Sequence, residues 1–349
     1  MDEQLTVSAS PHIRAEESTR SVMLDMLIVL SIAPLPLAVY FFGWRSLSIT
    51  LLSVTCCVVF EYLYRKLLKK PNSLGDLSAP VTGMLFAFTL PVTAPYWLVA
   101  LGAFFAVVVV KQLYGGLGKN FLNPALSARV FLSGFASLAV YVRPLLEEGE
   151  RVPVLGPFNA AAVAQATPLS VLKDAEQLSL NGLPLNVFSW QDLFFGQIPG
   201  NIGEVSAAVL LLGGLYLLIR RVIRLRIPLA FLGTVALLTF LFPRGLPEGD
   251  TVSLWIFNTS VDYMLFHLLS GGLILGAVFM ATDYATGPVT PRGQWIFGVG
   301  CGALTVFIRT FGAVAEGVWY AILLMNTVVW LLDRTCAPRR FGRRWLRRE

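Results

Sequence analysis

The sequence is poor in charged residues, histidine and cysteine. Of its 349 residues, 14% are charged and 56% are hydrophobic, whereas soluble domains carry about a quarter charged residues. It has only two histidines and four cysteines, and no two of the cysteines form a Cys-X-X-Cys pair. The low charge excludes a water-soluble enzyme. The residues offer no zinc or iron–sulfur ligand set, and because only His267 lies in an apolar run, a haem held between two histidines is excluded as well.

The sequence contains several long runs of apolar residues. Since an α-helix rises about 1.5 Å per residue and a hydrocarbon core is about 30 Å thick, such runs are typical of transmembrane helices. They predict helices at 23–42, 46–64, 79–92, 96–113, 124–142, 205–219, 228–242, 262–282, 294–311 and 314–332. We therefore expect an all-α, polytopic integral membrane protein with about ten transmembrane helices.

Basic residues lie beside these runs. There are 27 Lys and Arg against 21 Asp and Glu, with basic clusters at 65–70, 220–226 and 334–348. All three clusters fall on the same side of the predicted bundle, and such a bias marks the cytoplasmic side. We expect both termini in the cytoplasm, the connection 143–204 outside, and no nucleic-acid partner.

An internal repeat relates the two halves of the chain. The segments 83–86 (GMLF) and 91–93 (PVT) are echoed by 276–279 (GAVF) and 288–290 (PVT). Five predicted crossings separate the copies, so the second is inverted relative to the first, which indicates two inverted five-helix repeats. The expected parts are a cytoplasmic segment at 1–22, the first repeat at 23–142, an extracytoplasmic loop at 143–204, the second repeat at 205–332 and a basic cytoplasmic tail at 333–349.

The third helix of each repeat is short or interrupted. The first has few residues before Pro91, and the second follows an interrupted stretch at 253–261 that either re-enters the membrane or spans it. Broken helices near the midplane leave backbone groups free to bind ions or cofactors. A proline that simply ends a helix is the alternative.

Four residues of the loop 115–124 (GGLGKNFLNP) are candidates for binding a flat or anionic ligand: Gly116, Lys119, Asn120 and Asn123. Glycine allows close approach of the backbone, and the asparagines offer donors and acceptors. A structural turn, in which Asn123 caps a helix that begins with Pro124, explains the same residues.

Some ionisable residues fall within the predicted helices, where charge is costly and tends to serve function. The candidates for an ion path are His267, Glu316, Arg309 and Arg129. Arg309 and Glu316 could instead pair as a structural bridge near the outer surface. Three acids at predicted membrane edges are expected to be solvated: Asp25, Glu61 and Asp333. Thr167, in the outer loop before Pro168, is by residue type a turn residue or a helix cap.

Five segments occur together in order over nearly the whole chain: 10–14 (SPHIR), 115–129, 166–169 (ATPL), 283–295 and 326–342. In combination they resemble the family of Rnf complex D subunits and their relatives, the B subunits of sodium-pumping NADH:quinone reductases. The resemblance implies a membrane subunit of a complex, in the bacterial cytoplasmic membrane, that couples ferredoxin and NAD to movement of Na⁺ or H⁺. It would not act alone.

The resemblance also implies cofactors and partners. In that family the threonine of the Ala-Thr-Pro segment carries FMN through a phosphoester, which maps onto Thr167 and would supply the redox chemistry. A second, non-covalent flavin such as riboflavin is implied, and the loop 115–124 is our candidate for its contacts. The implied partners are the other membrane subunits, the flavin-bearing G subunit, the C subunit on the cytoplasmic side, and the lipid bilayer.

Two other functions are compatible with the same fold. A solute channel or transporter of inverted-repeat architecture needs no redox step, and a scaffold protein would leave all cofactors to its neighbours. Fold alone does not separate these functions. The flavin content of the purified chain would.

Overall fold

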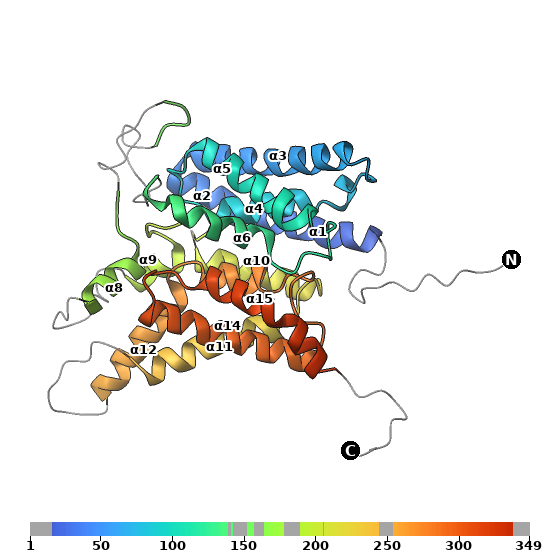
Figure 1. The fold of residues 1–349 in the computed structure, drawn as a ribbon. Coiled ribbons are helices and arrows are strands. Elements are labelled where there is room, and N and C mark those ends of the chain that lie inside the picture. The colour runs from blue at the N-terminus through green and yellow to red at the C-terminus, as the bar shows by residue number, and fades with distance from the viewer. Residues whose placement is uncertain are drawn as a thin grey trace, which may run out of the picture.

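A computed structural model describes residues 16–138, 141, 152–156, 164–177, 189–204, 206–243 and 254–337. Within these ranges the regular elements are all helices. Figure 1 shows them as two groups that lie against each other, residues 16–138 in blue to green and residues 206–337 in yellow to red. The short helices α8 (Pro168–Gln177) and α9 (Trp190–Phe195) lie together at one end of the bundle.

In the first group, α3 packs against α4 and α5, while α6 packs against η2. The elements are α1 (Glu16–Ile32), α2 (Pro34–Phe42), α3 (Trp44–Leu67), η1 (Leu74–Asp76), α4 (Ser78–Phe88), α5 (Tyr96–Phe104), η2 (Phe105–Gln112), α6 (Pro124–Leu132) and η3 (Ser133–Leu138).

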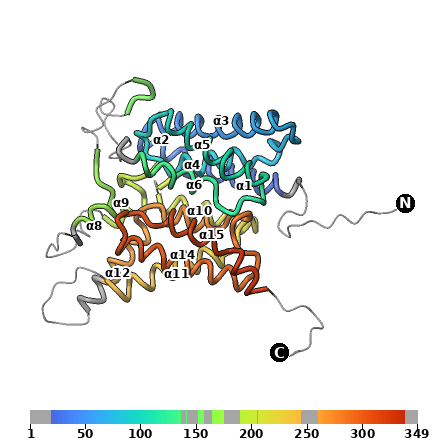
Figure 2. The backbone as a smooth tube through the Cα atoms, in the orientation of Figure 1, coloured from blue at the N-terminus to red at the C-terminus, as the bar shows by residue number. Residues whose placement is uncertain are grey.

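The second group packs in the same way. Here α11 contacts α12 and α14, and α14 contacts α15. The elements are α10 (Ala207–Ile219), α11 (Arg226–Leu241), α12 (Leu254–Leu269), α13 (Leu273–Leu275), η5 (Gly276–Met280), α14 (Pro291–Phe311) and α15 (Val318–Thr335). The groups meet where α1 contacts α10 and α6 contacts α15, as the tube in Figure 2 also shows.

Several helices are long and apolar enough to cross a membrane. They are Thr19–Phe42, which joins α1 and α2, then Trp44–Leu67 and Pro291–Phe311, and a fourth is the bent pair Ser260–Leu269 with Leu273–Met280. Further apolar helices are shorter, among them Ser78–Phe88 and Ala207–Ile219. These features are those of a membrane protein. The ten crossings and their inverted arrangement stay a prediction.

Two predicted helices end earlier than expected. The helix predicted at 79–92 stops at Phe88, because Pro91 and Pro95 cannot continue it. The segment after it instead bonds to another loop, with Ile202 N donating to the Leu90 carbonyl at 2.9 Å and Gly203 N to the Phe88 carbonyl at 2.9 Å. The helix predicted at 124–142 is α-helical only to Leu132 and continues as the 3₁₀ helix η3.

The helix predicted at 262–282 is not continuous, and the interruption expected at 253–261 is wrong. Helix α12 runs unbroken from Leu254 to Leu269, and the break follows it at residues 270–272. The two sides of the break are bent by 63°. Gly271 has φ +69°, a backbone conformation that residues with a Cβ rarely adopt, so this glycine permits the bend.

Gly83, which belongs to the internal repeat, is a point of close helix packing. A Cβ atom at Gly83 would lie 2.8 Å from Val54 Cα of α3, so the two backbones touch here. Ser53 Oγ donates to the Gly83 carbonyl at 2.6 Å. Small residues with hydroxyl hydrogen bonds are a typical means of holding helices together in a membrane.

Candidate functional site

A cavity of about 340 Å³ lies between α6 of the first group and α15 of the second. This volume falls within the range of sites that enclose small organic ligands. Its wall includes Thr167 at the start of α8, so the cavity is at the end of the bundle where α8 and α9 lie. The residues that line it are Arg129, Val130, Ser133, Tyr141, Thr167, Ser170, Val314, Ala315, Glu316, Trp319 and Tyr320.

Thr167 is both a helix cap and part of this wall. Its side chain is buried, with 6% exposed, and Oγ1 accepts a hydrogen bond from Ser170 N at 3.3 Å. The same hydroxyl donates to Ser170 Oγ at 3.1 Å, while Ser170 Oγ donates to the Thr167 carbonyl at 2.8 Å. An ester at Oγ1 would remove only the hydroxyl donor. The oxygen that caps α8 would remain an acceptor, so the cap and an attached group are compatible.

Arg129 supplies positive charge to the cavity. Its Nη2 donates to the Tyr141 hydroxyl at 3.4 Å, whereas its buried Nε has no hydrogen-bond partner among the described residues. A guanidinium with a free N–H is well suited to a phosphate group. The aromatic rings of Trp319 and Tyr320 in the same wall are suited to a flat ring system. These residues therefore fit a phosphate-linked flavin.

Two buried carboxylates lie beside this cavity. Glu316, which lines it, accepts from Trp319 Nε1 at 3.0 Å. Glu204, just before α10, accepts from Asn201 Nδ2 at 2.6 Å and from the Asn201 backbone N at 3.3 Å. Burial, together with the charge of Glu316, raises the pKa of Glu204 well above its ordinary value.

Of the predicted ion-path residues, the structure buries His267, Arg309 and Glu316 and leaves Arg129 half-buried. Arg309 Nη1 donates to the His267 carbonyl at 2.7 Å and Nη2 to the Ser270 carbonyl at 3.1 Å. Arg309 therefore satisfies carbonyls that the broken end of α12 leaves free. Among the described side chains no Arg309–Glu316 ion pair forms, so the predicted bridge is replaced by this cap.

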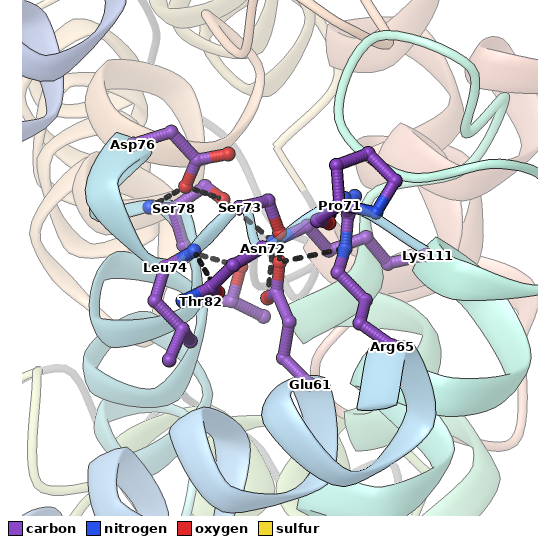
Figure 3. Close-up of polar contacts among 10 residues, drawn as sticks. All are labelled: Glu61, Arg65, Pro71, Asn72, Ser73, Leu74, Asp76, Ser78, Thr82 and Lys111. Carbon is purple, nitrogen blue, oxygen red and sulfur yellow. Dashed lines mark hydrogen bonds and ion pairs between the residues drawn. The ribbon is translucent and has the colours of Figure 1, made fainter. Parts of the chain in front are cut away.

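The end of the bundle opposite α8 and α9 holds a buried ion pair (Figure 3). Lys111 Nζ lies 2.7 Å from Glu61 Oε2, and the two side chains are 2% and 1% exposed. Lys111 also donates to Ser78 Oγ at 2.6 Å, and Ser73 Oγ donates to Glu61 Oε1 at 2.5 Å. The prediction that Glu61 is solvated is therefore wrong, because η2 brings a lysine against it.

The other two acids expected to be solvated are also bound. Asp25 is buried and lies 3.2 Å from Arg220 Nη2. Asp333 is half-buried and accepts from Val289 N at 2.9 Å. In each case the partner comes from a distant part of the chain, which the position of the acid at the end of an apolar run does not indicate.

In the loop 115–124, Asn123 caps α6 as one of the two interpretations predicted. Its Oδ1 accepts from the backbone N of Ala125 at 3.1 Å and of Leu126 at 3.3 Å. Its Nδ2 donates to the Met280 carbonyl of the second group at 3.3 Å. Asn123 thus ties the first group of helices to the second.

The other three candidates of this loop are placed differently. Asn120 is buried, donates to the Leu122 carbonyl at 3.1 Å, and has an Oδ1 without a partner among the described residues. Gly116 has φ +98° and leaves room for Arg65, whose Nη2 would be 2.7 Å from a Cβ at this position. Lys119 is exposed.

A second cavity, of about 60 Å³, brings Asn120 and Asn123 together with Lys111 and Asp283, while Gly116 and Lys119 are not part of its wall. Burial raises the pKa of Asp283, which accepts from Ala285 N and Thr286 Oγ1. The volume is well below that of sites enclosing an organic cofactor.

The sequence analysis missed Lys111 and the Asn201–Glu204 pair. The signal for Lys111 was present, since it is a charge at the end of the apolar run 105–110. Asn201 and Glu204 stand directly before the apolar residues of α10, but only the fold brings them to Glu316.

Comparison with known proteins shows similarity along the whole chain. A model of the NQR2, RnfD, RnfE family matches residues 6–342. The chain is 41% identical over 351 residues to the D subunit of the Na⁺-translocating ferredoxin:NAD⁺ oxidoreductase complex of Acetobacterium woodii, with 99% of this chain and 98% of the relative covered. It is 38% identical over 346 residues to the D subunit of the proton-translocating ferredoxin:NAD⁺ oxidoreductase complex of Clostridium ljungdahlii, with 97% and 96% covered. It is 39% identical over 318 residues to the D subunit of the ion-translocating oxidoreductase complex of Stutzerimonas stutzeri, with 87% of each covered.

Proposed function

Because the chain belongs to the NQR2, RnfD, RnfE family, we propose that it is the D subunit of an Rnf-type ion-translocating ferredoxin:NAD⁺ oxidoreductase complex. The observation that carries this proposal is the similarity, over nearly the full length, to D subunits of such complexes. One relative is named for Na⁺ and another for protons. The coupled ion is therefore proposed to be one of these two.

We place the chain in the bacterial cytoplasmic membrane, with ten crossings in two inverted five-helix repeats and both termini in the cytoplasm. The alike packing around α3 and α11 supports the repeat. So do the contacts of α1 with α10 and of α6 with α15, since a pseudo-twofold axis brings equivalent helices together. The proposed partners are the other membrane subunits, the G subunit and the C subunit.

We propose that Thr167 carries FMN through a phosphoester. The support is its position: Oγ1 lies in the wall of a ligand-sized cavity, and the cap that it makes survives esterification. Arg129 would balance the phosphate charge through its unpaired Nε, and Trp319 would bury one edge of the ring. When bound, the flavin would accept and pass on electrons.

We also propose that a second, non-covalent flavin binds at the loop 115–124. Asn120 Oδ1 is an unpaired acceptor, within the described residues, that a ligand could satisfy. The cavity beside it is about 60 Å³, so this flavin would have to lie partly against a neighbouring protein of the complex.

The test of the covalent flavin compares Thr167→Ala with Thr167→Ser. The serine variant keeps an oxygen that can cap α8, whereas the alanine variant removes both the cap and the attachment atom. Produced together with a flavin transferase, the wild type should keep flavin fluorescence after denaturation and gain the intact mass of one FMN less water. Thr167→Ala should lose both.

A fluorescent Thr167→Ala variant would place the attachment at another residue. A wild type without any flavin would contradict the redox role and favour a transporter or a scaffold protein. Arg129→Gln should still be modified but should alter the absorption spectrum of the folded protein, because the phosphate and ring would lose their counter-charge. Identical spectra would contradict the role of Arg129.

A further inference from the structure

Glu204 and Glu316 meet at the break between α12 and α13. A Cβ atom at Gly271 would lie 3.5 Å from Glu316 Oε1, and one at Gly272 would lie 2.9 Å from Glu204 Oε1. Glu204 comes from the segment just before α10 and Glu316 from the connection between α14 and α15, and both are buried. Consecutive glycines at the break thus make room for two acids side by side.

The two carboxylates accept few hydrogen bonds from the surrounding residues. Glu204 receives both hydrogen bonds from Asn201, and Glu316 receives one from Trp319. The two acids are close enough that the negative charge of Glu316 acts on Glu204. Two ionised carboxylates buried side by side repel each other, and a proton on one of them removes this repulsion.

An unpaired oxygen in the same cluster points to the same deficit. Asn201 Oδ1 is fully buried and has no partner among the described residues. Its own Nδ2 donates to Glu204, so the planar amide places Oδ1 within the cluster. Ser270 Oγ, next to the break, is likewise buried without a partner in the described part of the chain.

One cationic group, Arg309, lies beside the two acids at the break itself. Arg309 faces the break, with Nη2 3.4 Å from the Cβ position of Gly271. His267 Nδ1 lies 3.4 Å from Arg309 Nη1, so this nitrogen must present a lone pair and the ring is neutral. At the break, one guanidinium and two ionised carboxylates would leave a net charge of minus one, which one proton neutralises, while Arg129 lines the cavity and is half-buried.

The other titratable groups near the pair come from the neighbouring elements. They are Arg129 and Tyr141 on the α6 side, Tyr263 on α12, and Lys173 on α8, which is bonded to the carbonyls of Gly312 and Val314. Arg129 and Tyr141 line the cavity together with Glu316. The cavity gives Glu316 a path for proton exchange that Glu204 alone lacks.

We propose that Glu204 and Glu316 together hold one exchangeable proton at the α12–α13 break, beside the cavity that Thr167 lines. The site binds the proton whether or not Thr167 is modified. If the proposed flavin is present, the same site supplies a proton acceptor within its cavity. The raised pKa of Glu204 agrees with a proton kept at neutral pH.

The experiment is infrared difference spectroscopy of the full chain, purified in its complex and titrated with acid and base in H₂O and D₂O. The wild type should show the C=O band of a protonated carboxyl at neutral pH, shifted in D₂O and lost in one step at higher pH. Glu204→Gln and Glu316→Gln should each remove that titrating band. Asp262→Asn, a half-buried acid on α12, should keep it.

Three outcomes would overturn the proposal. They are a wild-type spectrum without this band at neutral pH, a band that survives both glutamine variants, and a band that Na⁺ abolishes at constant pH, which would make the site a sodium site. Thr167→Ala should retain the band, so that failure of the flavin proposal and of the proton proposal are distinguishable. If a variant does not fold, the titration of the wild type alone still tests whether the protonated carboxyl is present at neutral pH.

Discussion

At the residue scale, the ion pairs Glu61–Lys111 and Asp25–Arg220 differ in how completely they are enclosed. The Glu61 and Lys111 side chains are 1% and 2% exposed, whereas Arg220, the partner of Asp25, is 51% exposed. Removing one member of an enclosed pair leaves a charge without compensation, while an exposed pair is screened by water. The two pairs should therefore respond differently to the same type of substitution.

We expect Glu61→Gln to lower the free energy of unfolding by about 3–5 kcal/mol, because the buried ammonium of Lys111 would lose the negative charge that compensates it. Asp25→Asn should cost about 1 kcal/mol or less. Denaturant unfolding in detergent measures both, and Glu61→Gln combined with Lys111→Met should recover most of the loss. Equal losses for the two single variants would contradict the burial argument.

The stability of the chain should also depend on pH through Asp283. Burial raises its pKa in the folded state, so between the unfolded and folded pKa values the folded chain holds the extra proton. Its contribution is complete below the unfolded pKa and is lost as pH rises through the folded pKa. Thermal midpoints measured across the acidic range should fall in the wild type over this window. In Asp283→Asn this fall should be absent, and an unchanged pH profile would be the contrary result.

The sequence predicted some of these residues and missed others for a physical reason. Asn123 as the cap of α6 follows from its neighbour Pro124, since capping is local. Glu61 was expected in water because its place near the end of an apolar run says nothing of Lys111, which lies 50 residues further on. The meeting of Glu204 with Glu316 is non-local in the same way.

At the element scale, the broken helices show where apolar length misleads. Proline marked the end of α4, but the break at residues 270–272 lies within one apolar run that is long enough to count as a single span. The glycines of Ser270-Gly271-Gly272 carried the signal. Gly271 has a positive φ, which explains why a glycine is needed at the break, and this φ is known only from the backbone structure.

Gly83 and Gly233 form a matched pair for testing helix packing. Gly83→Ala should destabilise the chain by about 1–3 kcal/mol, because the new Cβ would meet the α3 backbone 2.8 Å away. Gly233→Ala, on α11 with nothing within 4 Å, should be neutral or stabilising by up to about 1 kcal/mol. Thermal unfolding compares them. If both variants behaved alike, the close contact of α3 and α4 would be refuted.

At the scale of the whole molecule, the two ends of the bundle should lie on opposite sides of the membrane. Leu155 is 81% exposed at the end that holds the Thr167 cavity, and Lys119 is exposed in the loop at the other end. In a background without native cysteines, Leu155→Cys should react with a membrane-impermeant maleimide in intact spheroplasts. Lys119→Cys should react only after permeabilisation, and the opposite pattern would invert the proposed topology.

The bend between α12 and α13 also has a consequence for how the chain is made. The carbonyl of Ser270 is satisfied by Arg309, which the ribosome adds 39 residues later. The short piece beyond the bend, Leu273–Met280, falls far below the roughly 20 apolar residues that enter a bilayer unaided. A nascent chain that ends before α14 therefore leaves polar backbone exposed to lipid. We therefore expect that the translocon completes the membrane integration of residues 270–280 only after α14 has been synthesised.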